Sequence, residues 1–239
     1  FACGGSKQLK STVVKQQNTM DTTNTKVKLI FTHIPLYTKQ ALDVLSKQLW
    51  LKQNGWYLAG GTALTLQCDH RTSVDLDFFI PHKGVDLESI IEVLSPDWIT
   101  TNRKKDTLYG ELKNSKVSFI AYPYFVPKQP FITYKFINIL DACDIAVMKI
   151  IAISQRGKKR DFFDLYWYIT HRESLLDVLQ RVKDQYPNSQ HNYHHIIKSL
   201  TYFEEAQEDP QPQIFFDATW ERIKQHFITI VPDVADKLL

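Results

Sequence analysis

The sequence predicts an α+β protein in which a lobe built on a mixed sheet is followed by a helical C-terminal lobe. Short apolar runs separated by Gly, Asn and Pro turns dominate the first half, which is typical of strands and short helices. From Asn138 onward, apolar residues instead recur at helical spacing. We therefore expect an α/β lobe over 26–137 and a helical lobe over 138–239, preceded by a disordered or non-native tail over 1–25.

The elements of the first lobe can be predicted in chain order. The amphipathic run KQALDVLSKQLWLK predicts a helix over 39–52, ended by Asn54 and Gly55. The tail is rich in Ser, Thr, Gln, Asn and Lys, and residues 1–19 precede the first Met, so we interpret them as upstream read-through or a disordered tail. The remaining predictions are strands at 56–59, 74–80, 98–102, 107–112 and 117–122, short strands near 131–136, and helices at 62–67 and 85–94.

The second lobe is predicted to be helical throughout. Asp141 is a suitable N-cap for a helix over 142–155, and Arg156-Gly157 would end it. Four further helices are expected, at 159–170, 174–186, 193–207 and 218–227.

Bulk composition excludes several classes of protein. Hydrophobic residues make up 44% and charged residues 23% of 239 residues, as in ordinary globular proteins. A net charge of +3 neither indicates nor excludes nucleic-acid binding. Cys3, Cys68 and Cys143 lack CxxC spacing and predict no disulfide framework or zinc site, which favours a reducing cytoplasm. No apolar run approaches membrane-spanning length, and the first residues lack the apolar core of a secretory signal.

The stretch YLAGGTALTLQCDHRTSVDLDFFIP is the most informative part of the chain. Gly60, Gly61 and Thr62 lie between a predicted strand and a predicted helix. Glycines there let a phosphate approach the backbone N–H groups at the positive end of a helix. By itself the Gly-Gly pair is also compatible with an ordinary strand-to-helix turn, which is the commoner case.

Two carboxylates follow on the next predicted strand. Asp75 and Asp77 alternate with the apolar Leu76 and Phe78, so both acids point to one face. Like charges at this spacing repel unless a cation lies between them, and carboxylate oxygens suit a hard divalent ion. The alternative is a polar strand edge, but the combination with the glycine turn favours a metal and phosphate site.

These motifs resemble a known family. The pattern GGTAL, a short helix and then HRxSxDLDFF is similar to the minimal nucleotidyltransferase fold, and more narrowly to the AbiEii/AbiGii-type toxin family of bacterial nucleotidyltransferases. The run DIAVMKIIAISQRGKKRDFFDL, over 144–165, resembles the family's second block. The resemblance spans 38–230. It implies an NTP substrate, Mg²⁺ (with Mn²⁺ as an alternative) on Asp75 and Asp77, and a toxin or phage-defence role beside a cognate antitoxin.

The second block also supports a site on physical grounds. Lys149 is the one charged residue between Ile145 and Ile153, so a packed helix would direct it toward an anion. The alternative is a lysine on the polar stripe of the helix. Asp161 and Asp164 share a helix face, and the resemblance implies that Asp161 belongs to the site. Asp164 would orient either Lys149 or an arginine.

Flanking residues complete the candidate site. Arg71 could brace a phosphate or the two acids, with a solvated loop charge as the alternative. Ser73 could cap the strand or touch phosphate. Nucleotidyltransferases often have a third carboxylate on a neighbouring strand, where this chain has Ser118, and Glu111 could replace it only if it faces inward. Asp161 is then a hypothetical base from the other lobe.

Other polar clusters carry less information. His191, His194 and His195 begin a predicted helix without a nearby acid or Cys, so we expect no metal there. The basic runs 103–105 and 158–160 could meet RNA phosphates, or they are solvated loop charges.

The predicted function is therefore an Mg²⁺-dependent nucleotidyltransferase. Its predicted catalytic residues are Asp75, Asp77, Lys149 and Asp161; its predicted nucleotide-binding residues are Gly60, Gly61, Thr62, Arg71, Ser73 and Lys149. The acceptor would be RNA (tRNA) or protein. The alternative is a catalytically weak or inactive nucleotide-binding or partner-binding module on the same fold, which Ser118 favours.

Overall fold

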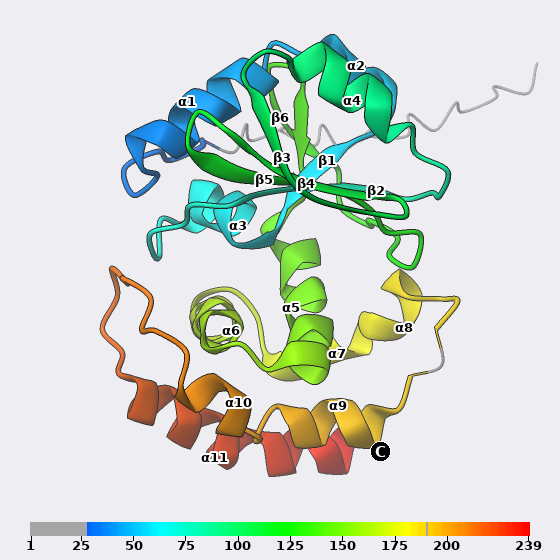
Figure 1. The fold of residues 1–239 in the computed structure, drawn as a ribbon. Helices are drawn as coiled ribbons and strands as arrows, with labels where there is room; N and C mark the ends of the chain where they lie inside the picture. Colours follow the sequence, from blue (N-terminus) through cyan, green and yellow to red (C-terminus); the bar gives the residue numbers. More distant parts are fainter. Residues whose placement is uncertain (1–27, 190) are drawn as a thin grey trace, which may run out of the picture.

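A computed structural model describes residues 28–189 and 191–239. The first part of the chain forms a β-sheet with helices packed on it, which we call the sheet part. The second part, the helical part, is a group of helices that lies against one face of the sheet (Figure 1). The predicted tail over 1–25 lies outside the described residues. The α+β class with a mixed sheet is confirmed.

Among the described residues, seven strands form one mixed sheet in the order β3-β4-β5-β2-β1-β7-β6. The central strand β2 runs antiparallel to β1 and parallel to β5. The strands are β1 (Tyr57–Ala59), β2 (Leu76–Ile80), β3 (Trp98–Lys104), β4 (Thr107–Leu112), β5 (Ser115–Ala121), β6 (Ile132–Tyr134) and β7 (Ile137–Ile139).

The upper face of the sheet in Figure 1 is covered by α1 (Leu36–Leu45), α2 (Leu49–Gln53) and α4 (Leu87–Leu94). Alternate residues of β2 are buried against this layer, as the sequence pattern predicts. The ring of Phe119 on β5 packs at 5.3 Å from Trp56, between centroids. This apolar core leaves the opposite face of β2 and β5 directed toward the helices that follow.

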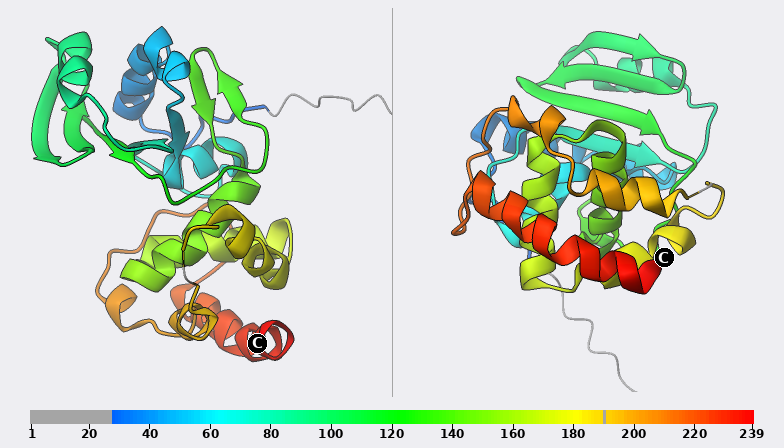
Figure 2. Two further views of the ribbon diagram at one scale, coloured as in Figure 1. Left: turned by 90° about the vertical axis from the view of Figure 1, so that its right-hand side faces the viewer. Right: turned by 90° about the horizontal axis from the view of Figure 1, so that it is seen from below.

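That opposite face is approached by α3 (Gly60–Cys68) and α5 (Ala142–Arg156) (Figure 1). Asp141 caps α5 by accepting from the Cys143 N–H at 2.8 Å, and Gly157 ends the helix with a left-handed backbone, both as predicted. The remaining helices are α6 (Lys159–His171), α7 (Leu175–Gln180), α8 (Val182–Gln185), α9 (Tyr193–Ser199), α10 (Glu204–Gln207) and α11 (Trp220–Leu238). Figure 2 shows α11 at the end of the helical part that is remote from the sheet.

The single helix predicted over 39–52 is wrong, because the chain forms two helices with a break at 46–48. Ser46 is fully buried, and its carbonyl accepts a hydrogen bond from the backbone N–H of Phe136, between β6 and β7. This tertiary bond takes a carbonyl from the helical pattern, which periodicity alone does not reveal.

Three predicted helices of the second lobe differ from the structure by more than their end residues. The helix predicted over 174–186 is divided at Arg181, and the one predicted over 193–207 is divided by a turn at 200–203. That turn places Phe203 against Phe162 at 5.2 Å between ring centroids, so core packing outweighs helix continuity. The last helix extends to Leu238 instead of residue 227, because its buried stripe continues to Val231.

A segment near the C-terminus returns to the sheet part (Figure 1, orange). The backbone N–H of Thr72 donates to the carbonyl of Gln213, and that of Phe215 donates to the carbonyl of His70. The ring of Phe215 also stacks on His33, 3.2 Å between centroids. Through these contacts, residues 213–215, which are distant in the sequence, hold the loop before β2 in place. Within the described residues, no helix has both the length and the apolarity to cross a bilayer.

Candidate active site

The turn from β1 into α3 brings the backbone against Asp77. Ala59 lies opposite Asp77 in the β1–β2 register. Gly60 has a φ of +71°, and a Cβ there would lie 2.9 Å from Asp77 Oδ2. Glycine is therefore required for both backbone conformation and space. The first turn of α3, with its free N–H groups, begins beside the carboxylate that the sequence predicts as a metal ligand.

Gly61 is constrained by space alone, through two other side chains. A Cβ at this position would lie 2.1 Å from Arg71 Nη2 and 3.1 Å from Ser73 Oγ. The Thr62 hydroxyl donates to the backbone carbonyl of Asp75 and lies 2.9 Å from Ser73 Oγ. Thr62 and Ser73 are both buried. The structure thus uses these two hydroxyls to attach the loop before β2 to α3, and their contact with phosphate stays a prediction.

Asp75 and Asp77 lie together at the start of β2. Asp75 immediately precedes the strand instead of lying within it, and Asp77 is its second residue. Burial, and then the charge of Asp75, raise the pKa of the Asp77 carboxyl, although a hydrogen bond from Ser118 and the nearby Arg160 and Lys149 act in the opposite direction. At Asp77, burial and the neighbouring acid thus outweigh the effect of the nearby cations. Two carboxylates in this state fit a hard divalent cation such as Mg²⁺.

Ser118 occupies the neighbouring position on β5. It is the direct partner of Asp77 in the parallel β2–β5 register. Glu111 lies on β4 beside Lys116, two strands from β2 and therefore about 10 Å away by strand spacing. Within residues 28–189 and 191–239, no group of three or more His, Cys, Asp or Glu side chains is arranged to hold a metal ion. Glu111 thus does not supply a third ligand in this structure.

The second part of the site is a network of charges that we call the interlobe network, consisting of Arg71, Lys149, Arg156, Asp161 and Asp164. Lys149 Nζ lies 2.7 Å from Asp161 Oδ1 and 2.6 Å from Asp164 Oδ2. Its anions are therefore protein carboxylates. Lys149 is also close enough to Asp77 to lower that carboxyl's pKa. The structure thus places Lys149 in the surroundings of Asp77, and its role in the site stays a prediction.

Asp164 is the centre of the network. It accepts from Arg71 through both oxygens, Nε to Oδ1 at 2.5 Å and Nη2 to Oδ2 at 2.9 Å, while its Oδ1 lies 2.7 Å from His70 Nε2. Burial alone would raise its pKa, but Arg71 and Lys149 hold the pKa of Asp164 well below its usual range. The sequence left open whether Asp164 orients Lys149 or an arginine; it contacts both.

Asp161 is fully buried and already carries two cations. Besides Lys149, it accepts from Arg156 Nε at 3.0 Å. Three of the four lone-pair positions on its two oxygens already accept hydrogen bonds from these cations, and full burial leaves an acceptor hydroxyl little access to the fourth. The geometry therefore supports Asp161 as the group that positions Lys149 better than it supports proton transfer.

The sequence did not identify two contacts of the site. Arg160 Nη1 reaches from α6 to Asp75 Oδ2 at 3.1 Å, joining the helical part to the acid pair. Its sequence signal is its place next to Asp161, within the basic run 158–160. His70 is buried, and burial lowers the pKa of its imidazole. Its Nδ1 has no hydrogen-bond partner in the described part of the chain.

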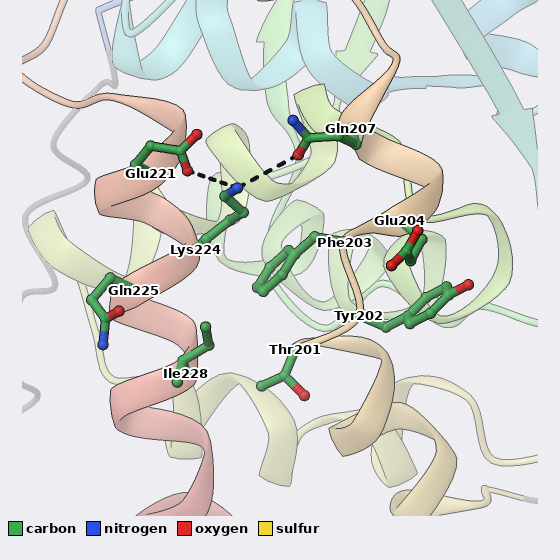
Figure 3. Close-up of a pocket in the computed structure, with 9 residues that line it drawn as sticks. All are labelled: Thr201, Tyr202, Phe203, Glu204, Gln207, Glu221, Lys224, Gln225 and Ile228. Carbon is green, nitrogen blue, oxygen red and sulfur yellow. Dashed lines mark hydrogen bonds and ion pairs between the residues drawn. The ribbon is translucent and has the colours of Figure 1, made fainter.

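A separate cavity lies in the helical part, away from these acids. It has a volume of about 560 Å³ and is bounded by α10, α11 and the turn before α10 (Figure 3). Lys224 at its edge already contacts Glu221 at 2.7 Å and Gln207 at 3.5 Å. None of the predicted site residues lines it.

Comparison with known proteins decides the family. Residues 44–118 and 130–238 match the family described as nucleotidyl transferase AbiEii toxin, type IV toxin–antitoxin system. The chain belongs to the AbiEii family. The resemblance inferred from the two motif blocks is thereby confirmed, as is the assignment of the chain as a nucleotidyltransferase enzyme.

Individual relatives are less informative about activity. The chain is 40% identical over 181 residues to an uncharacterized protein of Aquifex aeolicus (strain VF5), aq_aa25, covering 73% of this AbiEii chain and 85% of the relative. JHP933 from Helicobacter pylori is 18% identical with a TM-score of 0.48, over 86% of this chain and 94% of the other. MenT4, a nucleotidyltransferase toxin from Mycobacterium tuberculosis H37Rv, is 16% identical with a TM-score of 0.49, over 83% and 86%.

Proposed function

We propose that this AbiEii chain transfers a nucleoside monophosphate from an NTP to a hydroxyl group of an RNA (tRNA) or protein acceptor. The acceptor oxygen bonds to the α-phosphorus, the bond to the β-phosphate oxygen breaks, pyrophosphate leaves and the hydroxyl proton passes to water. The observation that supports this best is the Asp75–Asp77 pair placed against the first turn of α3. This arrangement would combine metal ligands with a phosphate-binding helix N-terminus.

The residues of the chain divide the work as follows. Asp75 and Asp77 would hold Mg²⁺ (or Mn²⁺), which supplies Lewis-acid stabilisation of the phosphates when bound. The N–H groups that begin at Gly60 and Gly61 orient the triphosphate. Arg160, Arg71 and Lys149 supply positive charge around developing negative charge. Since phosphoryl transfer depends mostly on positioning and charge, the absence of a third acid at Ser118 lowers the rate without excluding the reaction.

In the cell, the proposed role is that of the toxin in a toxin–antitoxin or phage-defence pair in the cytoplasm, with a cognate antitoxin protein as partner. The family description supports a toxin–antitoxin role. Expression of the wild-type chain is expected to arrest growth. Co-expression of a small regulator encoded next to it should restore growth. Unimpaired growth on expression of a chain that is active in vitro would contradict the toxin role.

The transfer itself is tested by incubating the purified chain with each α-labelled NTP, Mg²⁺, and either total RNA or lysate protein. Label should enter one acceptor class from at least one NTP, and chelation by EDTA should stop it. Asp77→Asn should abolish the signal. Asp233→Asn, a matched change at an exposed position of α11, should leave it intact.

Two observations favour the second candidate function, a nucleotide-binding module without efficient transfer. Ser118 takes the place of a third carboxylate, and Lys149 is already held by two acids. NTP binding that is equal in the presence and absence of Mg²⁺, with no labelled acceptor, would support this alternative over the enzyme.

A further inference from the structure

We propose that a cavity on the same face of the sheet as the acid pair, lined by Tyr122, Tyr124, Tyr186, Ile151 and Gln155, binds a nucleobase. The cavity has a volume of about 590 Å³, within the size range of small-molecule sites. The base belongs either to the donor NTP or to a nucleotide of an RNA acceptor. This inference rests on the proposed function and adds to it the place where the base is recognised.

Its first support is the position of the cavity along β5. Ser118 is the register partner of Asp77. Side chains alternate along a strand, so Tyr122, which follows the strand directly, continues the face of Ser118. Four residues of extended chain place Tyr122 about 13 Å from Ser118. The cavity and the acid pair thus lie on the same face of the sheet, the one that is directed toward the helices.

The second support is that α5 leads to the same place. Lys149 contributes to the surroundings of Asp77, and Gln155 lies six residues further along the same helix, about 9 Å along its axis. The cavity therefore has walls from the sheet part and from the helical part. The cavity of Figure 3, by contrast, has walls from the helical part alone.

The walls have the chemistry of a stacking site. Tyr122 is held edge-on by Phe79 at 5.7 Å and by Tyr186 at 6.2 Å between ring centroids. Tyr124 packs edge-on against Tyr122 at 5.6 Å and is itself 46% exposed, so a fixed aromatic group supports a ring with an accessible surface. Lys83 Nζ lies 5.9 Å from the Tyr124 centroid. Any nucleobase can stack on such a ring.

The cavity also has groups that could read the edge of a base. Gln155 provides an amide with both donors and an acceptor, and it is exposed on α5. His195 on α9 also lines the cavity, with Nε2 3.0 Å from the carbonyl of Ser154. An apolar aromatic wall next to an amide suits a flat, heteroatom-edged ring better than a purely apolar ligand.

The test measures binding rather than turnover. The Asp77→Asn chain is titrated with each NTP, with tripolyphosphate and with tRNA. Its Kd values are compared with those of double variants that carry Tyr124→Ala or Tyr124→Phe in addition. Tyr202→Ala is the matched control, because Tyr202 is also half-exposed (49%) and lies at the cavity of Figure 3. Both tyrosines are exposed enough for the chain to fold without them.

The expected result is a Kd about tenfold weaker for Tyr124→Ala, as for the loss of one stacked base. Tyr124→Phe should restore binding, and tripolyphosphate should not respond. A loss confined to NTPs assigns the base to the donor; a loss confined to tRNA assigns it to the acceptor. If Tyr124→Ala binds both ligands as Tyr202→Ala does, or if Phe fails to rescue, the inference is wrong. Because no transfer is measured, this result is independent of whether the chain is an active enzyme.

Discussion

Arg71 and Asp164 are 93 residues apart in the chain and form a two-point ion pair between the loop before β2 and helix α6. Both side chains are buried, at 6% and 0% exposure. A carboxylate that also contacts Lys149 and lies next to His70 fixes the arginine beside Gly61 and Ser73. The helical part of the molecule therefore holds in place the turn from β1 into α3, where we propose that phosphate binds.

Asp164→Asn is expected to destabilise the fold strongly. Removing one buried partner leaves Arg71 and Lys149 undercompensated, which typically costs about 3–5 kcal/mol. Urea unfolding followed by circular dichroism measures this. The matched control is Asp217→Asn, since Asp217 pairs with Arg222 at 99% side-chain exposure and its loss should change the free energy by less than about 1 kcal/mol. Similar losses of unfolding free energy in the two variants would show that the interlobe network does not stabilise the fold.

Gly60→Ala is expected to affect binding beyond its effect on stability. Gly60 and Gly84 both have a positive φ, but a Cβ at Gly84 meets nothing within 4 Å, whereas one at Gly60 meets Asp77. Alanine at either position should cost about 1–2 kcal/mol in backbone strain. Only Gly60→Ala should also weaken the thermal stabilisation produced by NTP with Mg²⁺. If Gly84→Ala weakens it equally, strain alone explains the effect and the Gly60–Asp77 contact has no separate role.

Much of this arrangement follows from the sequence, and the remainder depends on long-range contacts. The i, i+2 spacing of Asp75 and Asp77 and the isolated charge of Lys149 are local patterns, so they could be predicted. The contacts of Arg160 with Asp75 and of His70 with Asp164 join residues 85 and 94 positions apart. No periodicity encodes such pairs. The break at Ser46 was missed for the same reason, because its cause is a backbone bond from Phe136.

The Asp77 carboxyl gives a prediction about pH. Its pKa is raised in the folded state by burial and by Asp75, so the folded chain binds this proton more tightly than the unfolded chain. Tighter binding of this proton stabilises the folded chain below the unfolded pKa of 3.8. This stabilisation is lost as pH rises through the higher folded pKa. Above that window, Asp77→Asn should be about 1 kcal/mol more stable than the wild type, although inactive.

Thermal melts with and without Mg²⁺ separate the two effects. Without metal, the melting temperature of wild type should fall relative to Asp77→Asn as pH rises from 4 toward neutrality, over the window set by the raised pKa. Mg²⁺ should raise the melting temperature of the wild type and leave Asp77→Asn unchanged. An equal Mg²⁺ response in both chains would remove Asp77 from the metal site.

Ser118→Asp tests whether the missing third acid limits the enzyme. Because Ser118 is in register with Asp77, a carboxylate there would join the existing pair and add repulsion while no cation is bound. The variant should melt at a lower temperature than the wild type without metal, and Mg²⁺ should raise its melting temperature more than it raises that of the wild type. Transfer should become faster, by about tenfold or more, if a third ligand improves metal placement.

Ser118→Asn is the control for the size of the new side chain, since it is close in shape to aspartate but carries no charge. It should show neither the larger Mg²⁺ response nor the faster transfer. If Ser118→Asp responds to Mg²⁺ as Ser118→Asn does, the β5 position does not face the metal, and the slow step lies elsewhere. If the Mg²⁺ response grows but transfer does not, Ser118 faces the metal and the third acid is not what limits the rate. The ion pairs of Lys149 with Asp161 and Asp164, which neutralise its charge, would then be the next feature to alter.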